Sequence, residues 1–166
     1  MKIREVTLND SAEMVILMKQ VEKEAEYMLF EPGERNITIE QQSKTIESMK
    51  KEGSKSTIFV AEDNDKLVGF LVVIGNNIRR TQHQVYLVIG ILKEYRGLGV
   101  GTQLFTQLHK WALEHDIHRL ELTVVTENEA GVALYKKMGY KIEGVKKHSI
   151  KIKGEYADQY YMAKLL

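Results

Sequence analysis

The chain has 166 residues, with 24 lysines and arginines against 23 aspartates and glutamates, no cysteine and one proline. This length and a hydrophobic fraction of 43% fit one domain, residues 1–166, whose core needs no covalent crosslinks. The absence of cysteine excludes disulfides, thiolate metal clusters and a cysteine nucleophile. The net charge of +1 argues against a general polyanion binder, so any bound anion must be held by local geometry.

No segment has the pattern of a targeting or membrane-spanning sequence. Residues 1–5 lack the apolar core of a secretory signal, and no run approaches the roughly 20 apolar residues that cross a bilayer. We therefore expect a cytoplasmic protein with no membrane or nucleic-acid partner. We also expect no metal site.

The first segments predict a strand followed by a helix. Residues 3–8 alternate enough for a short strand, and Asp10 with Glu13 has the spacing of a capping box that opens a helix. Apolar residues then recur at helical spacing. They predict a helix that continues to about Phe30, before the turn at Pro32.

A second helix and a hairpin follow. Thr38 and Gln41 repeat the capping signature, and a thin apolar stripe runs to about Lys51, which indicates a surface helix. The sequence that follows is rich in β-branched and aromatic residues. Residues 57–61 and 67–74, joined by an Asn-Asp turn, predict the two strands of a hairpin.

The middle of the chain predicts a buried strand and a strong helix. Residues 85–92 are apolar at both parities, as in a central strand that is covered on both faces. Gly90 inside this strand indicates a bulge or the close approach of another backbone. The clearest helical periodicity begins near Val100.

The last third predicts three more strands and one helix. The strands are residues 120–125, 141–152 and 156–163, and Asn128 caps a helix that stops at Gly139. The order is therefore βααβββαβαββ. It predicts an α/β fold with four helices and a mixed sheet of about seven strands, with one right-handed parallel crossover.

The segment most informative about function is Arg96-Gly97-Leu98-Gly99-Val100-Gly101, between a buried strand and a helix start. Glycines at alternate positions let backbone N–H groups turn toward one point, and the helix N-terminus adds partial positive charge. This pattern predicts a phosphate or pyrophosphate site; the alternative is a tight turn without a ligand. A P-loop lysine is missing, and the glycine spacing does not match a dinucleotide fingerprint.

The same residues resemble the GNAT superfamily, whose members are acyl-coenzyme-A-dependent N-acyltransferases. The family's pyrophosphate loop reads Gln/Arg-x-x-Gly-x-Gly/Ala, and residues 96–101 match it at every fixed position. A second family element appears as Asn128, then Tyr135 seven residues later, then Gly139-Tyr140. The resemblance implies a GNAT-like fold with a largely antiparallel sheet and splayed central strands. It also implies acetyl-CoA as the acetyl donor.

Several roles follow from this resemblance alone. The N–H groups of the loop would hold the pyrophosphate, and the strand edge before the loop would pair with pantetheine. The Ile91 N–H would stabilise an oxyanion, and Gly90 would mark a bulge that opens the gap. The residues expected to contact the coenzyme are Ile89, Gly90, Ile91, Arg96, Gly97, Leu98, Gly99, Val100, Gly101, Thr102, Asn128, Ala133, Tyr135 and Lys137.

Three of these assignments have plainer alternatives. Tyr135 would be the general acid that protonates the departing thiolate; the alternative is a buried helix tyrosine whose hydroxyl is satisfied. Asn128 would bond the pantetheine arm, or it only caps its helix. Lys137 would reach the 3′-phosphate, or it is a solvated surface lysine.

The proton acceptor for the substrate amine stays open. The central strand carries no carboxylate, and His83 just before it is a candidate because imidazole titrates near pH 6.5. Glu62 and a chain of waters are equally open. The resemblance implies that the first two helices and the loop between them shape the acceptor site. Tyr27 and Glu31 are candidate acceptor residues there, within an acidic stretch that would favour a cationic amine; the alternative is an ordinary solvated face.

These observations support one main hypothesis and two others. The first is an N-acetyltransferase that moves the acetyl group of acetyl-CoA directly to a primary amine, small or peptidyl, through a tetrahedral intermediate; without cysteine there is no acyl-cysteine. The second is a non-catalytic acyl-CoA sensor or interaction domain. The third is a dinucleotide-binding oxidoreductase. A homodimer is an additional expectation.

Overall fold

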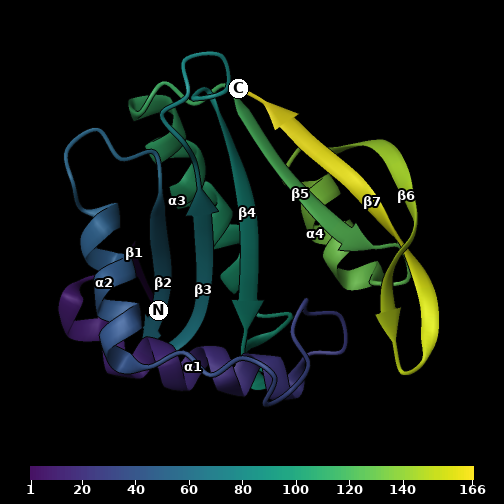
Figure 1. Ribbon diagram of the computed structural model, residues 1–166, viewed down its shortest axis with the longest axis horizontal. Coiled ribbons are helices and arrows are strands. Elements are labelled where there is room, and N and C mark those ends of the chain that lie inside the picture. The colour runs from purple at the N-terminus through teal and green to yellow at the C-terminus, as the bar shows by residue number, and fades with distance from the viewer.

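Seven β-segments assemble into one sheet in the computed structural model, which describes all 166 residues (Figure 1). The predicted order βααβββαβαββ is confirmed. The strands are β1 (Lys2–Glu5), β2 (Thr57–Asp63), β3 (Lys66–Ile74), β4 (Gln84–Ile91), β5 (Arg119–Val125), β6 (Lys141–Ile152) and β7 (Glu155–Leu165). The helices are α1 (Ser11–Glu24), α2 (Ile39–Met49), α3 (Val100–Glu114) and α4 (Glu129–Lys137).

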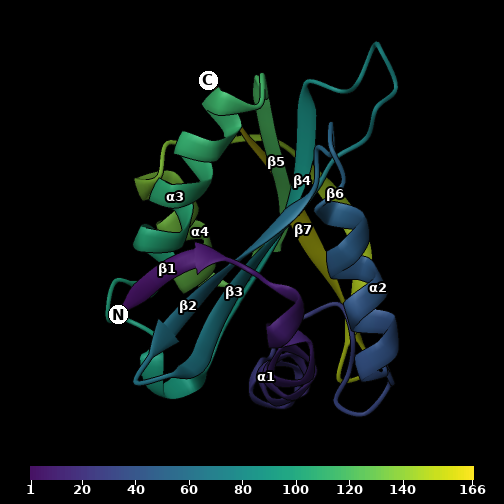
Figure 2. The same ribbon diagram turned by 90° about the vertical axis from the view of Figure 1, so that its left-hand side faces the viewer.

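The sheet order is β1-β2-β3-β4-β5-β7-β6, and only β4 and β5 are parallel neighbours. Helices α3 and α4 lie on one face of the sheet, and α1 and α2 lie on the other (Figure 2). The core fills the space between these layers and includes Phe59, Phe70, Leu104 and Phe105, all at most 1% exposed. The predicted fold class is therefore confirmed.

The two central strands separate after a short contact. Strands β4 and β5 pair only from Gln84 with Arg119 to Tyr86 with Glu121. Beyond this point the two strands diverge, and the gap widens toward their carboxyl ends (Figure 1). The half of β4 that follows Tyr86 therefore has one edge without a strand partner, as the resemblance implied.

Gly90 does not mark a bulge, which corrects the prediction. The ladder between β3 and β4 runs without a register shift, with Phe70 opposite Gly90 and Gly69 opposite Ile91. The glycine is instead required by packing. A Cβ at Gly90 would lie 2.6 Å from the Phe70 ring and 2.8 Å from the Val21 side chain of α1. The gap therefore arises because the β4–β5 pairing stops, and not because β4 is distorted.

We expect Gly90→Ala to lower the free energy of unfolding by about 1–3 kcal/mol, because the added methyl group overpacks a closed core. Gly144→Ala is the matched control, since a Cβ there meets nothing within 4 Å. Urea denaturation of both variants measures the difference. Equal stability of the two variants would show that the Phe70 ring moves aside at little cost.

The start of α1 differs from the predicted capping box of Asp10 and Glu13. The box forms one turn earlier, where the Thr7 N–H donates to Asp10 Oδ2 over 2.7 Å, and β1 accordingly ends at Glu5. Glu13 instead accepts the Leu67 N–H over 2.6 Å. A capping box and a tertiary contact use the same residue types, so the spacing alone did not separate them.

The first helix also ends earlier than predicted, at Glu24 and not near Phe30. The chain turns into an extended conformation at Ala25, and the segment of residues 25–38 folds back along the helix. Arg35 pairs with the buried Glu22, and its guanidinium lies 4.5 Å from the centre of the Phe30 ring. These tertiary contacts explain why the helical spacing does not continue as a helix.

The ion pair between Arg4 and Asp10 predicts a loss of stability in acid. The hydrogen bonds from Arg4 lower the pKa of the buried Asp10 carboxyl to about 2. A carboxyl whose folded pKa is depressed stabilises the fold above its unfolded pKa, near 3.9, and this stabilisation is lost as the pH falls toward 2. We expect about 2 kcal/mol from this group. Asp10→Asn should remove that part of the stability difference measured by denaturation at pH 5 and pH 2; an unchanged difference would contradict it.

Candidate functional site

The loop between β4 and α3 presents a row of unused backbone donors. No N–H group from Gly97 to Thr102 donates a hydrogen bond within the chain; the first donation at this helix start is from Gln103 to the Gly99 carbonyl, 3.1 Å. These six donors lie at the positive end of a 15-residue helix. Such an arrangement is suited to a phosphate or pyrophosphate.

Glycine is needed at the three loop positions for two different reasons. Gly97 and Gly99 have φ angles of 75° and 83°, a region that side chains disfavour, although a Cβ at either would meet open space. Gly101 is buried, and a Cβ there would lie 2.7 Å from Leu134 of α4. The first two glycines therefore shape the loop, and the third lets α3 approach α4.

The other predicted loop residues divide by exposure. Leu98 is 64% exposed at the tip of the loop, whereas Val100 is buried beneath it. Lys137, near the end of α4, donates to Thr102 Oγ1 over 3.3 Å, so the structure brings this lysine to the first turn of α3. Its ammonium group adds positive charge beside the free N–H groups.

The unpaired edge of β4 presents further donors to the gap. The Leu92 N–H donates to the Val68 carbonyl on the β3 side, 3.0 Å away. Because N–H groups alternate along a strand, those of Ile91 and Ile89 point to the β5 side, into the gap. Arg96 lies at the same edge and donates from Nε to the Ile91 carbonyl over 3.1 Å. The gap thus offers backbone groups with which an extended ligand can pair.

Tyr135 lies on α4, which covers the same face of the sheet as α3 (Figure 2). Its ring packs edge-on against Phe105 with 5.7 Å between centroids, and the residue is 8% exposed. Burial, and after it the charge of Tyr86, raises the pKa of Tyr135 above the ordinary value of a phenol. The hydroxyl therefore keeps its proton and is a hydrogen-bond donor. Ala133 lies two residues earlier on an exposed face of the same helix.

Asn128 caps α4, as predicted. Its Oδ1 accepts the Gly131 N–H over 3.0 Å. A Cβ at Gly131 would lie 2.6 Å from Asn128 Nδ2, so glycine at this position lets the amide fold over the helix start. The cap fixes where α4 begins and, with it, where Tyr135 lies.

The structure does not bring His83 to the other site residues. His83 precedes the first residue of β4, whereas Ile91 ends that strand, and eight residues of strand span about 26 Å. Glu62 lies on β2, and strands β3 and β4 separate it from the gap. Its carboxylate accepts a hydrogen bond from Arg4 Nε over 2.6 Å. Neither side chain is placed to take a proton at the gap.

The acidic segment after α1 reaches the start of α4. Loss of solvation, and then the carboxylates of Glu26, Glu127 and Glu129, raise the pKa of the Tyr27 phenol, so these groups lie near one another. Glu26 also pairs at 3.9 Å with Lys153 in the turn between β6 and β7. Glu31 is exposed in the same segment and is not among the carboxylates that act on Tyr27.

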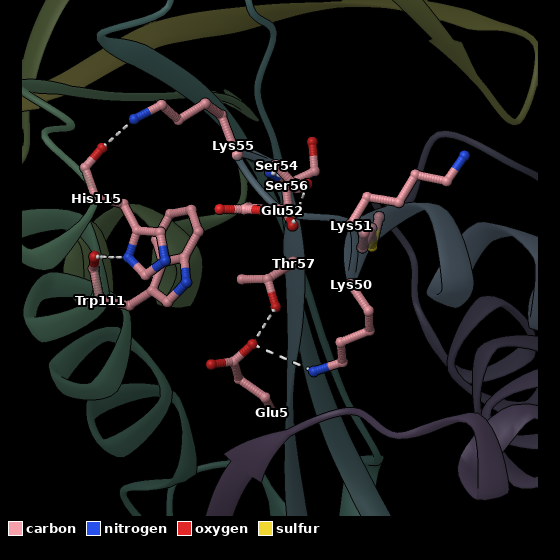
Figure 3. Close-up of a pocket in the computed structure, with 12 residues that line it drawn as sticks. Glu5, Lys50, Lys51, Glu52, Ser54, Lys55, Ser56, Thr57, Trp111 and His115 are labelled. Carbon is pink, nitrogen blue, oxygen red and sulfur yellow. Dashed lines mark hydrogen bonds and ion pairs between the residues drawn. The ribbon is translucent and has the colours of Figure 1, made fainter.

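A cavity of about 300 Å³ lies elsewhere, between the loop after α2 and the end of α3 (Figure 3). Several of its polar groups pair with one another: Glu5 accepts a hydrogen bond from Thr57 Oγ1 over 2.8 Å and pairs with Lys50, and Lys55 donates to the His115 carbonyl. It contains no residue of the glycine loop. The free donors therefore identify the loop and the gap as the better candidate site.

One polar contact at the gap could not be predicted from the sequence. The hydroxyls of Tyr86 on β4 and Thr123 on β5 are 2.7 Å apart at the start of the gap. The two residues are 37 positions apart, and the only sequence signal is a tyrosine within an otherwise apolar strand.

No helix combines the length and apolar character needed to cross a membrane. No three histidine, aspartate or glutamate side chains converge as a metal-binding group. These two observations describe the structure and assign no activity to it.

Comparison with known proteins agrees with this geometry. The chain is 31% identical over 103 residues to the L-amino acid N-acetyltransferase AaaT of Escherichia coli, covering 60% of this chain and 62% of that protein. It is 32% identical over 105 residues to the spermidine N(1)-acetyltransferase of Escherichia coli, covering 59% and 52%. The chain thus spans less than two thirds of the length of these curated relatives.

Solved structures match over nearly the whole chain. An acetyltransferase of the GNAT family from Streptococcus pneumoniae has a TM-score of 0.95 and 30% identity, covering 99% of both chains. The yncA protein of Salmonella typhimurium, solved with its cofactor acetyl-CoA, has a TM-score of 0.87 at 16% identity, covering 99% and 93%, and so shares the fold. The model of the acetyltransferase (GNAT) family matches residues 17–140. This match, which includes the glycine loop, the gap and Tyr135, shows that the chain belongs to the GNAT family.

Proposed function

We propose that this protein transfers the acetyl group of acetyl-CoA directly to a primary amine. The observation that carries the proposal is the row of six free N–H groups, residues 97–102, next to the gap between β4 and β5. Bound acetyl-CoA would supply an acetyl group activated as a thioester. The chain's own residues would bind it, orient it and manage the protons.

Backbone groups carry most of the binding. The N–H groups of residues 97–102 would hold the pyrophosphate, with Lys137 beside them for the 3′-phosphate. The N–H groups of Ile89 and Ile91 would pair with the pantetheine arm, and the amide of Asn128 would bond it from the other side. This explains how a chain with a net charge of only +1 can bind a polyanionic coenzyme.

Two donors would act on the reacting bonds. The Ile91 N–H would stabilise the developing oxyanion at the thioester carbonyl, a contribution of about 2.7–4 kcal/mol to the barrier for such donors. Tyr135 would donate from its hydroxyl to the departing thiolate. Because its pKa is raised above that of a thiol, near 8.5, hydrogen-bond donation is favoured over complete proton transfer before the carbon–sulfur bond breaks.

The acceptor we propose is a cationic amine, either a small molecule or a peptide terminus. The carboxylates of Glu26, Glu127 and Glu129 all act on Tyr27 and help to raise its pKa. Clustered carboxylates raise the local concentration of positively charged amines. The relatives named for L-amino acids and spermidine act on amines, which agrees with this class.

The test is thiol release from acetyl-CoA across a panel of polyamines, amino acids, aminoglycosides and peptides with free N-termini. We expect release that depends on one cationic class of amine, and weaker use of that class by the double variant Glu127→Gln with Glu129→Gln. Binding of acetyl-CoA without thiol release from any amine would support the sensor alternative. Binding of NAD alone would contradict both.

Two further expectations accompany the proposal. A homodimer and a cytoplasmic location stay predictions; sedimentation velocity checks the first and fractionation of cells checks the second. A monomer at micromolar concentration would contradict the dimer.

A further inference from the structure

The last turn of α1 packs closely on the carboxyl end of β4. A Cβ at Gly90 would lie 2.8 Å from the Val21 side chain, so glycine at this position lets the helix approach the strand. About one turn further along α1, Glu24 Oε2 accepts a hydrogen bond from the Lys93 N–H over 2.7 Å. These two contacts hold the end of α1 across the end of β4, as Figure 1 shows.

The Glu24 carboxylate is consequently close to the reacting end of the proposed coenzyme site. Lys93 follows Ile91 by two residues, and two residues of extended chain span at most about 7 Å. With the hydrogen bond added, Glu24 Oε2 lies within about 10 Å of the Ile91 N–H. Glu94, next along the chain, is directed elsewhere, because it pairs over 3.8 Å with Lys66 of β3, and β3 is on the other side of β4 from the gap.

The charge of Glu24 is not neutralised within the chain. Its two carboxylate oxygens accept hydrogen bonds from Gln20 Nε2, over 2.6 Å, and from the Lys93 N–H, and both donors are uncharged. It forms no ion pair, whereas the buried Glu22 on the same helix pairs with Arg35. Because each carboxylate oxygen can accept more than one hydrogen bond, the partly exposed side chain can still bind a cation from solution.

Glu24 also keeps its charge at neutral pH. The hydrogen bond from Gln20, and after it the one from the Lys93 N–H, lowers the pKa of Glu24, and the charges of Arg96 and Lys93 lower it further. A carboxylate that stays ionised holds a bound ammonium group in its protonated form, and a protonated nitrogen has no lone pair with which to attack a carbonyl. The cation held by Glu24 is therefore not the nitrogen that reacts.

We propose that Glu24 binds a second cationic group of the acceptor, so that the favoured acceptor is a short diamine. One amine would pair with Glu24 while the other, in its deprotonated form, attacks the thioester near the Ile91 N–H. A chain of about three to five methylene groups places its two nitrogens roughly 5–8 Å apart, which fits between these two positions. The inference rests on the proposed acetyl transfer and refines it: the acidic segment attracts cations in general, and Glu24 selects acceptors with two charges.

The test compares diamines with monoamines of the same chain length. Thiol release from acetyl-CoA is measured with putrescine and butylamine, and with cadaverine and pentylamine, for the wild type and Glu24→Gln. Glutamine keeps an oxygen for the Lys93 N–H and removes only the charge, so it separates cation binding from a structural role. Glu94→Gln is the matched control, because it removes the charge next to Lys93 on the β3 side. Calorimetry with acetyl-CoA and thermal denaturation are recorded for every variant.

We expect the wild type to use each diamine with a kcat/KM at least about 10-fold above that for the matching monoamine. Glu24→Gln should lower kcat/KM for the diamines about 10- to 100-fold, mainly through KM, because a hydrogen bond between charged groups contributes about this much. The same variant should leave kcat/KM for the monoamines within about twofold, with acetyl-CoA affinity and melting temperature unchanged. Glu94→Gln should match the wild type with all four amines.

Three results would overturn the role of Glu24 and leave the proposed acetyl transfer intact. They are equal use of diamines and monoamines by the wild type, undiminished use of diamines by Glu24→Gln, and equal losses with both kinds of amine in that variant. Acetyl-CoA binding by the wild type without thiol release from any amine would instead overturn the proposed function.

Discussion

Tyr135→Phe is expected to lower kcat by about 100-fold or more while leaving acetyl-CoA affinity within about twofold. The substitution removes only the hydroxyl, because the ring that packs against Phe105 stays. Since the raised pKa keeps the hydroxyl protonated, the wild-type enzyme always has this donor, and the variant never has it. Steady-state thiol release and calorimetric titration measure the two quantities.

Tyr140→Phe is the matched control for this prediction. Tyr140 is 2% exposed and packs against the same Phe105, but its hydroxyl contacts only His109, at 3.5 Å. A comparable kcat for the two tyrosine variants would mean that general disturbance of the aromatic cluster explains the loss. Full activity of Tyr135→Phe would remove its role as a donor.

The second large effect is expected at the loop. Gly99→Val places a β-branched side chain at a φ of 83°, which costs about 1–3 kcal/mol and forces the loop to rearrange. Losing two charge-assisted N–H bonds at about 1.5 kcal/mol each would weaken acetyl-CoA binding about 100-fold. Calorimetric titration measures this change.

Gly53→Val separates backbone strain from loss of the anion site. Gly53 has a φ of 77° and open space around it, as Gly99 does, but lies in the loop after α2. We expect similar losses of stability in the two variants and weaker acetyl-CoA binding only in Gly99→Val. Unchanged affinity in Gly99→Val would show that the loop does not hold the coenzyme.

Local signals predicted most of the fold and the loop. The capping box of Thr38 with Gln41, the turn at Asn64-Asp65 and the cap at Asn128 all appear as the sequence indicated. Each depends on residues a few positions apart, so their spacing contains the information needed. The glycine loop belongs to this class, because its conformation depends on its own φ angles.

Features that depend on distant contacts could not be predicted in the same way. Gly90 was visible as an unusual residue, but only the structure shows that the Phe70 ring and Val21 occupy the space beside it. The end of α1 depends on the pairing of Glu22 with Arg35 across a turn. In both cases a local pattern had two interpretations, and packing decided between them.

The candidate site shows the same division. His83 directly precedes β4 in sequence. Because the strand is extended, a residue at its start lies far from Ile91 at its end. The hydroxyl pair of Tyr86 and Thr123 requires the register between β4 and β5, which the sequence does not contain.

The most direct test of the central claim is a ¹H–¹⁵N NMR titration of the protein with acetyl-CoA. The account predicts that the amide resonances of residues 97–102, together with those of Ile89 and Ile91, shift on binding. The N–H groups of residues 97–102 donate no hydrogen bond within the chain, and those of Ile89 and Ile91 lie on the edge of β4 that β5 leaves unpaired beyond Tyr86. NAD should leave them unchanged. Acetyl-CoA that binds without moving these resonances, or shifts only those around the Glu5 cavity, would contradict it.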